Sequence, residues 1–575
     1  MKLFSRKRGQ KALKQFSRLT EEAVDTGEAH IKKNFIRRLS HVGDVRLFVI
    51  EWGLLVFALF MLALTQTFWF NDSYSVYSFT DGGTYTEATL GKVSSLNPLF
   101  ATTNSEKTLA KLMFLGLTAS DASGHVGNVL AKSVKSDSSA KVWTVKLKDN
   151  LKWSDGEPLT PEDVVFTASL ISGLGRASSY NSNLNNVNVK LGENGEIVFE
   201  LPAVYAEFAS ALDFPILPKH VLENVDSMNL LESSFSTNPV SSGPFSFNAQ
   251  QAVGTSGETI VYLTRNKNYY KGAVKIDSFV VHAYLEVDSI KTALKTGAVS
   301  ATAELLPVDS ETITSKKIYE KQTAINSGVF LFMNTKTGVF KNRDTRKLLQ
   351  TGLDISEIRS LIGDELPLDY PILKSQLELK EWPALPAHNF EAAKTAVSAL
   401  DNKTIRLVTV NSGYLPTILE DVAQQLESLG FTVARSVEEP GQDFLVNVIA
   451  NRNYDILLYE VELGANPDLL VYYHSSQATQ NGLNLSNYNS SVADDLILSA
   501  RETADESVKK QKYEAFLSRW IDDAPAIGLY QVNLSYYFDK NVKPFGEDVS
   551  LVVATDRFVD IRFWGVEKVV KNRTP

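Results

Sequence analysis

The chain has 575 residues, of which 44% are hydrophobic and 22% are charged, so it can bury a large globular core. It contains no cysteine, which excludes disulfide frameworks, thiolate metal sites, cysteine nucleophiles and a lipid-modified cysteine anchor. Residues 1–46 carry 12 Lys and Arg against 5 Asp and Glu, a local +7, so the remainder carries −9 − 7 = −16. An acidic body repels the phosphate backbone, and we therefore expect no nucleic-acid partner.

A long apolar segment follows the basic N-terminal region. It begins at Leu47 and ends at Phe70, with Glu51 as its single charged residue. At about 1.5 Å per helical residue, it is long enough to cross the ~30 Å hydrocarbon layer of a bilayer. Trp52 and Trp69 lie near its two ends, where aromatic rings favour the membrane interfaces. We therefore predict a transmembrane helix embedded in the lipid bilayer.

The charges that flank this helix predict its orientation. The excess of Lys and Arg in residues 1–46 favours a cytoplasmic N-terminus, a single pass through the cytoplasmic membrane and a binding domain on its outer face. A cleaved signal peptide and a buried core helix are the alternatives. The basic region is longer than that of a signal peptide, and no convincing A-x-A cleavage site follows. An uncleaved anchor is therefore the preferred interpretation.

The exterior part is expected to begin after a short tether. Residues 71–83 are rich in Ser, Tyr, Asp and Gly and lack helical periodicity. Alternation of apolar and polar residues then predicts strands over residues 142–150, 196–202 and 259–266.

The clearest helix signal lies after the first of these strands. Thr160 can act as the N-cap, Pro161 fits the first helical position and Asp163 completes a capping box. Gly173 or Gly175 can end the helix.

The region from residue 404 onward alternates strands and a helix. Strands are predicted over residues 404–412, 431–437 and 454–462, and an amphipathic helix from Pro416 to Leu429 is stopped by Gly430. This order is typical of an α/β sheet with helical cover.

Short motifs in a fixed order resemble the family 5 extracellular solute-binding proteins, which are the peptide, dipeptide and nickel receptors of ABC importers. The matching stretches are LNPL (96–99), GL (116–117), LAKS (130–133), LKDNLKWSDGEPLTPEDVVFTASLI (147–171), PILPKH (215–220), SSGPFSF (241–247), LTRNKNYYKGAVKIDSFVV (263–281), VFLFMNT (329–335), FKNRDTRKLLQTGLDISEI (340–358), YDILLYEVELGANPDLLVYYHSS (454–476), NYNSSVADDLI (487–497) and DDAPAIGLY, which ends at Tyr530. Each piece is weak alone, and their shared order carries the resemblance.

The resemblance implies an α/β, two-lobed periplasmic-binding-protein-like fold (type II, cluster C) with an extra subdomain in the first lobe. Lobe I would comprise residues 84–119, 241–327 and 541–570, with residues 120–240 as the inserted subdomain. Lobe II would comprise residues 328–540. Two crossing strands would serve as the hinge, and a ligand would stabilise the closed state by contacting both lobes.

The resemblance also implies a function. A monomer without a cofactor would capture a solute, expected to be an oligopeptide or dipeptide, and deliver it to the permease subunits of an ABC importer. The chain departs from most bacterial members, which are secreted or carry a lipidated cysteine, because a transmembrane helix stands in that place.

In peptide-binding relatives, an Asp in the loop after the YDILLY-like strand binds the peptide ammonium. That loop usually reads Gly-Trp-x-x-Asp, whereas here the sequence is EVELGANP. If one residue is deleted, Glu462 takes the place of the Asp, and Glu460 is the reserve. A solvated loop carboxylate is the alternative for Glu462. The other cleft candidates, chosen by position only, are Tyr459, Asn466, Asn97, Leu96, Gly91 and Asn334.

A hydrolase is the competing class, and its motifs lack their context. The seven histidines show no H-E-x-x-H and no paired spacing, so no metal ligand is predicted. Lys-Thr-Gly occurs at 295–297 and 336–338 and S-x-x-K at 138–141, as in penicillin-interacting enzymes, but S-D-N is missing between them. We therefore predict no catalytic residues.

Two further questions stay open at the level of sequence. The solute could be an oligosaccharide, a metal chelate or an opine instead of a peptide. The protein could also bind or sense its solute without coupling to transport.

Overall fold

The computed structural model describes residues 46–571 apart from positions 123, 176–177, 179, 181–183, 185, 255–256, 314, 316, 364–365, 504, 548 and 550. The predicted basic segment, up to residue 45, lies outside the described residues. The described chain forms two compact units, one with the residues before Phe79 and after Lys568, and the other with Phe79–Lys568.

The smaller unit contains helix α3 (Arg46–Tyr74) and a two-stranded sheet of β1 (Ser75–Ser78) and β20 (Lys568–Lys571). Within α3, the stretch Phe48–Thr67 is long and apolar enough to cross a membrane. The helix continues four residues beyond the predicted end at Phe70, into the predicted tether. No Gly or Pro is present in those four residues to stop it, and Asn, Asp, Ser and Tyr are only moderately unfavourable in a helix.

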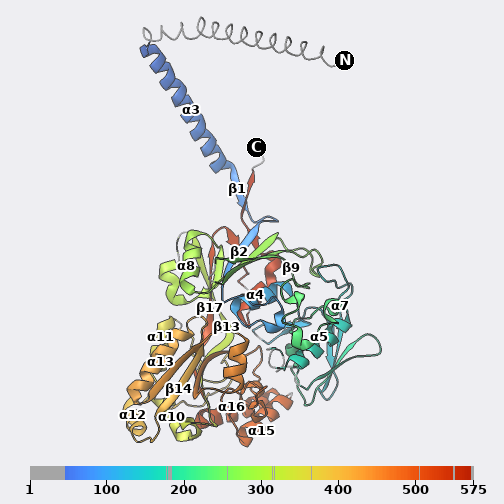
Figure 1. Ribbon diagram of the computed structural model, residues 1–575, viewed down its shortest axis with the longest axis vertical. Helices are drawn as coiled ribbons and strands as arrows, with labels where there is room; N and C mark the ends of the chain where they lie inside the picture. The colour runs from blue at the N-terminus through green and yellow to red at the C-terminus, as the bar shows by residue number, and fades with distance from the viewer. Residues whose placement is uncertain are drawn as a thin grey trace, which may run out of the picture. The chain divides into compact units, whose positions relative to one another are not determined.

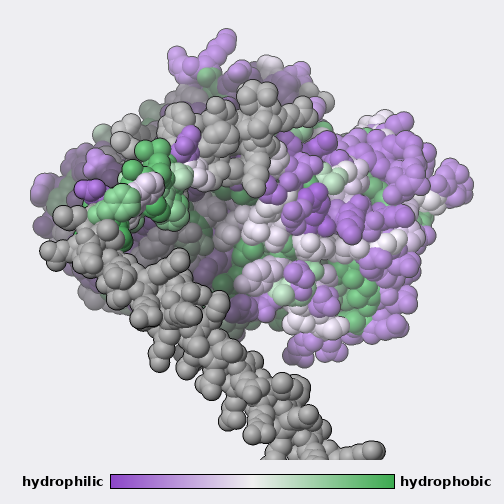
Figure 2. All heavy atoms as spheres, turned by 90° about the horizontal axis from the view of Figure 1, so that it is seen from above, coloured by the Kyte–Doolittle hydropathy of each residue, from purple (hydrophilic) through white to green (hydrophobic). Residues whose placement is uncertain are grey.

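The described side chains of the two units differ in surface character. In α3, large apolar side chains such as Phe57 and Leu62 are about 60% exposed. The larger unit buries most of its apolar side chains, and hydrophilic residues predominate over it on the face drawn in Figure 2.

One ten-stranded sheet forms the centre of the larger unit (Figure 1). Its strands, in spatial order, are β15 (Thr432–Glu438), β14 (Thr404–Val410), β16 (Ile456–Glu462), β13 (Ile318–Met333), β17 (Ala526–Asp539), β12 (Ala301–Leu305), β2 (Thr84–Leu90), β11 (Ser278–Tyr284), β10 (Glu258–Arg265) and β9 (Phe245–Val253). The strands predicted over 259–266, 404–412, 431–437 and 454–462 are confirmed as β10, β14, β15 and β16.

The two longest strands, β13 and β17, cross from one lobe to the other. They pair antiparallel from Ile318↔Asp539 to Phe332↔Ala526, and the register shifts between Ala324 and Gly328. The predicted lobe boundary at 327/328 falls in this irregular stretch. The far end of β17 pairs with β12 in the first lobe, so this strand belongs to both lobes.

The second lobe covers its part of the sheet with helices (Figure 1). They are α10 (Arg343–Gly352), α11 (Ile355–Ile362), α12 (Phe390–Ser398), α13 (Leu415–Leu429), α14 (Leu470–Tyr473), α15 (Ser491–Glu502) and α16 (Glu506–Asp523). The helix predicted from Pro416 to Leu429 is confirmed as α13, and Gly430 ends it with a φ of +108°, a value that glycine tolerates.

The inserted subdomain contains a separate four-stranded sheet of β5 (Ala131–Ser136), β6 (Val142–Leu147), β8 (Ile197–Glu200) and β7 (Asn188–Leu191), together with helix α5 (Pro161–Leu174). The predicted start of this helix is confirmed: the Thr160 amide donates to Asp163 Oδ2 at 2.8 Å, and Gly175 follows the last helical residue. Asp163 Oδ1 also accepts from the Lys219 amide at 2.8 Å. One carboxylate therefore links two of the sequence motifs.

Candidate functional site

Helix α4 (Asn104–Met113) of the first lobe carries two lysines that form ion pairs outside the helix. Thr103 caps the helix, and its amide donates to Glu106 Oε2 at 3.2 Å. Leu109 and Leu112 are fully buried on one face. Lys107 and Lys111, one turn apart, lie on a different face, where Lys107 pairs with Glu462 of the second lobe and Lys111 pairs with Asp556 of the first.

Lys107 forms an ion pair with a residue of the second lobe. Its Nζ lies 3.5 Å from Glu462 Oε1, and the two side chains are 47% and 56% exposed. The Glu462 carboxylate raises the pKa of the Lys107 ammonium, although desolvation works in the opposite direction. The pair therefore joins α4 of the first lobe to the end of β16 in the second, and we call the region around it the inter-lobe space.

The end of β16 supplies the acidic side of this space. Register Ser327↔Glu462 places this end beside the irregular stretch of β13. The following loop is held by the Leu463 amide, which donates to the Asn326 carbonyl at 2.7 Å. The Tyr472 hydroxyl donates to the Glu462 carbonyl at 2.8 Å. The backbone around Glu462 is thereby fixed, while its carboxylate faces the other lobe.

Two more carboxylates reach this space from the first lobe and its subdomain. Lys111 Nζ lies 2.7 Å from Asp556 Oδ1. Asp213 is an exposed residue, and its backbone packs so tightly on Gly116 that a Cβ there would lie 2.4 Å from the Asp213 carbonyl oxygen. Because glycine has no Cβ, position 116 allows the Asp213 backbone to pack this closely.

The balance of charge in this group is negative. Although Asp213 is exposed at the surface of this region, desolvation by the surrounding protein atoms raises the pKa of its carboxyl to about 6. The Lys111 ammonium opposes this rise, and the carboxylates of Asp556 and Glu462 add to it. Desolvation also raises the pKa of the Glu460 carboxyl. Four carboxylates share the space with two ammonium groups, so the arrangement suits a ligand that brings positive charge.

Three contacts join the subdomain directly to the second lobe. The Arg501 guanidinium lies 3.6 Å from the centre of the Tyr205 ring. Lys509 Nζ lies 2.5 Å from Glu207 Oε1. At Gly124, a Cβ would lie 2.4 Å from Asn466 Oδ1. Asn466 therefore contacts the opposing subdomain.

The structure brings together three of the predicted site residues. Tyr459, Glu460 and Glu462 lie at the end of β16, where Tyr459 packs on Phe444 with ring centres 5.7 Å apart. Asn334 does not join them. Its amide group donates to the carbonyls of Arg452 and Tyr454, at the opposite end of β16, because β13 and β16 run antiparallel.

The remaining predicted residues lie inside the first lobe. Leu96 and Asn97 are 3% and 1% exposed, and Asn97 Oδ1 caps a short 3-10 helix by accepting from the Leu99 amide. Gly91 has a φ of +108° and packs against Thr103, where a Cβ would lie 2.6 Å from the Thr103 Cβ. These positions shape the first lobe without exposing side chains to the inter-lobe space.

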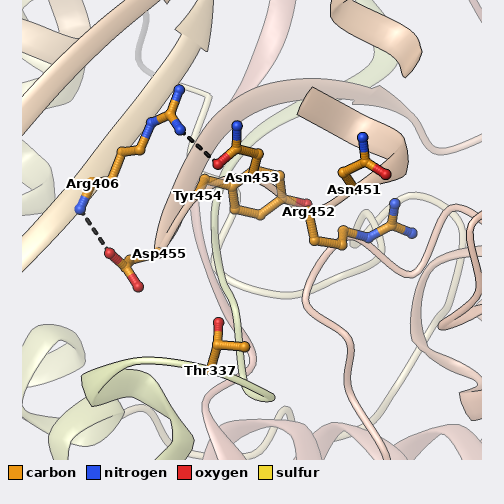
Figure 3. A pocket seen from close by; sticks show the side chains of 7 residues that line it. All are labelled: Thr337, Arg406, Asn451, Arg452, Asn453, Tyr454 and Asp455. Atoms are coloured by element: carbon orange, nitrogen blue, oxygen red, sulfur yellow. Dashed lines mark hydrogen bonds between the residues drawn. The ribbon is translucent and has the colours of Figure 1, made fainter. Parts of the chain in front are cut away.

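A separate hollow of about 360 Å³ lies at the beginning of β16 (Figure 3). Its lining residues are Thr337, Arg406, Asn451, Arg452, Asn453, Tyr454 and Asp455. The Arg406 amide donates to Asp455 Oδ2 at 2.8 Å, and Arg406 Nη1 donates to Asn453 Oδ1 at 2.6 Å. These polar groups bind one another within one lobe, so this hollow is distinct from the inter-lobe site.

Sequence reasoning missed Lys107, Lys111 and Asp213. The spacing of the two lysines was a readable signal, because residues four apart share a helix face. Asp213 immediately precedes the PILPKH stretch and showed no pattern of its own. Among the described residues, no group of three His, Asp or Glu could hold a metal ion.

Residues 125–536 match the family described as bacterial extracellular solute-binding proteins, family 5 middle, and the chain belongs to this family. The chain is 26% identical over 494 residues to the oligopeptide-binding protein AppA of Bacillus subtilis. The aligned region covers 81% of this chain and 89% of AppA. The family and this relative are binding proteins, so the chain is a solute-binding protein and not an enzyme.

Solved structures share the two-lobed fold. The structure of Bacillus subtilis AppA in complex with a nonapeptide has a TM-score of 0.74 at 24% identity, covering 85% of this chain and 100% of that one. Helicobacter pylori DppA in complex with the peptide STSA has a TM-score of 0.74 at 18% identity, covering 85% and 99%. Campylobacter jejuni NikZ in complex with Ni(L-His) has a TM-score of 0.70 at 20% identity, covering 84% and 99%.

Proposed function

We propose that the protein captures a peptide between its two lobes and that Glu462 binds the ammonium group of that peptide. The observation that carries this proposal is the Glu462 carboxylate, which projects from the second lobe into the inter-lobe space and already contacts an ammonium group there. The relatives support the ligand class, because AppA is an oligopeptide-binding protein and was solved with a nonapeptide. An ammonium group in a closed cleft requires such a carboxylate, since an unpaired buried charge costs on the order of several kcal/mol.

The excess of carboxylates supports the same assignment. The pKa of Asp213 is raised to about 6, and the pKa of Glu460 is also raised, so both gain from a nearby cation. Main-chain pairing of an extended ligand with strand edges would add affinity without selecting side chains.

Glu462→Gln tests the proposal. This change keeps the shape of the side chain and removes its charge, so we expect unmodified peptides to bind roughly 10- to 100-fold more weakly, because hydrogen bonds to charged groups contribute about 1.5–3 kcal/mol. Isothermal titration calorimetry with a library of unmodified peptides gives the dissociation constants. Glu391→Gln, an exposed residue on α12 in the same lobe, is the matched control. Equal affinities of Glu462→Gln and the native protein would contradict the assignment.

We further propose that α3 anchors this binding domain on the outer face of the cytoplasmic membrane, with the N-terminus inside, and that an ABC importer receives the solute. Support comes from the exposed apolar stretch Phe48–Thr67 and from the excess of basic residues before it. The protein should remain in the membrane fraction with an intact N-terminus and copurify with permease subunits. A mature protein that lacks α3 would contradict the anchor.

A further inference from the structure

Lys107 occupies the place that the proposed function gives to the ligand. Its ammonium contacts the Glu462 carboxylate at 3.5 Å, and the nearby Tyr459 and Glu460 also act on its pKa. All three of these neighbours belong to β16, in the lobe opposite to Lys107. An alkylammonium on a lysine and the α-ammonium of a peptide are the same kind of group, so they compete for one carboxylate.

We propose that Lys107 is an internal competitor for the ligand, which holds the lobes together through Glu462 and is displaced from that carboxylate when a ligand with a primary ammonium group binds. This inference rests on the proposed function and deepens it, because it states which chemical group of the ligand is selected. A ligand without a free ammonium, such as an N-acetylated peptide, cannot replace Lys107 at Glu462.

Displacement of the Lys107 ammonium from Glu462 should cost little free energy. Both side chains are about half exposed, and ion pairs of this kind contribute little to stability because water screens them. The flexible four-carbon stem of lysine lets the ammonium move into the water-accessible space while the helix stays in place. Lys111, one turn further along α4, is held instead by Asp556 within its own lobe, at 2.7 Å. Lys107 is therefore the lysine that a ligand can release.

The inter-lobe pair Lys509–Glu207 gives a matched comparison. Its N···O distance is 2.5 Å, and it joins α16 of the second lobe to the inserted subdomain. Neither partner belongs to the group around Glu462. A ligand at Glu462 leaves this second pair intact, whereas it breaks the pair of Lys107. Removal of Lys107 should therefore raise the affinity for the ligand, whereas removal of Lys509 should not, although both lysines join the lobes.

The first test needs no ligand. The chain has no cysteine, so Asn194→Cys in the subdomain and Glu514→Cys on α16 can be labelled selectively for distance measurement by electron paramagnetic resonance. Lys107→Met should shift the distribution toward longer, open distances, and Lys509→Met should do the same. An unchanged distribution for Lys107→Met, with a changed one for Lys509→Met, would overturn the proposal.

The second test measures peptide affinity by calorimetry for the native protein and the two lysine variants. The ligands are peptides of three or more residues, each in an unmodified and an N-acetylated form. Lys107→Met should bind unmodified peptides roughly two- to fivefold more tightly, since the lost pair belongs only to the unligated state and exposed pairs contribute up to about 1 kcal/mol. Lys509→Met should bind them with equal or lower affinity. N-acetylated peptides should show no gain with Lys107→Met. Weaker binding of unmodified peptides by Lys107→Met would mean that Lys107 contacts the ligand, and would overturn the inference.

The two proposals fail in different ways. If no peptide binds the native protein, the proposed function is wrong, while the distance measurement still decides whether Lys107 holds the lobes together. If peptides bind the native protein and Glu462→Gln lowers their affinity, but Lys107→Met does not raise it, the proposed function stands and the competitor role of Lys107 is wrong.

Discussion

Polar side chains lie at both ends of β16, but their hydrogen-bond and ion-pair partners belong to different parts of the molecule. At its beginning, Asp455 and its neighbours hydrogen-bond with Arg406 and with main-chain groups of the same lobe. At its end, the Glu462 carboxylate contacts a lysine of the other lobe. Polar groups that are satisfied within one lobe stabilise that lobe in every state. Groups whose partners belong to another lobe change partners when the lobes move, and these groups are available to a ligand.

The largest expected effect lies at the internally satisfied end. Arg452 is 7% exposed and donates to the carbonyls of Asn484 at 3.2 Å and Gly482 at 2.8 Å. Arg452→Met should lower the free energy of unfolding by about 3–5 kcal/mol, because several buried carbonyls lose their donors. Chemical denaturation followed by circular dichroism measures the change. Peptide affinity should stay the same below the unfolding transition, and a selective loss of affinity would break the comparison.

A smaller effect is expected at the inter-lobe end, and it depends on pH. The pKa of the Asp213 carboxyl is raised to about 6, chiefly by desolvation, and the charges of Lys111, Asp556 and Glu462 also act on it. Its carboxylate should attract a cationic ligand at pH 7 and lose that attraction as pH falls through about 6. The native protein should therefore bind unmodified peptides several-fold more weakly at pH 5 than at pH 7, and calorimetry at both values measures this.

Asp213→Asn is the control for that dependence and also tests stability. Because the folded pKa lies above the ordinary value of 3.8, the native protein holds this proton more tightly than the unfolded chain does. The free energy of unfolding then falls as pH rises from about 4 to about 6, and Asp213→Asn should remove this fall. A pH dependence of affinity that is identical in the variant and the native protein would exclude Asp213 as its source.

The smallest effect is expected at Asn453, on the rim of the hollow in Figure 3. Asn453 is exposed and accepts one hydrogen bond from the Arg406 guanidinium. Asn453→Ala should change the free energy of unfolding by about 1 kcal/mol or less and leave peptide affinity unchanged. Thermal unfolding and calorimetry check both values. A clear change in affinity would show that the two ends of β16 are coupled.

Local signals in the sequence predicted local structure well. The Thr160 cap, Pro161 and Asp163 fixed the start of α5, and Gly430 fixed the end of α13, because these residues act through their immediate neighbours in the chain. The strand that carries Glu462 was also predicted, since its apolar pattern is strong. The family motifs supplied the two-lobed fold that no local pattern could specify.

The sequence indicates only one side of the proposed site. Glu462 could be placed from the loop that follows β16, whereas Lys107 and Asp213 belong to segments that approach it only after folding. Asn334 was expected in the cleft from its position near the crossing strand. The antiparallel register of β13 and β16 takes it to the other end, and the direction of pairing is not readable from one sequence.

The position of β17 has a consequence for how the chain matures. This strand lies between β13 and β12, so the central sheet stays divided until residues near the C-terminus have been synthesised and moved to the same compartment. Pairing over such long sequence separations is slow, because the intervening chain must first be ordered. During that interval, the unpaired edges of the sheet are exposed to other chains, and the protein should depend on chaperone protection until β17, the last strand of the central sheet in chain order, is in place.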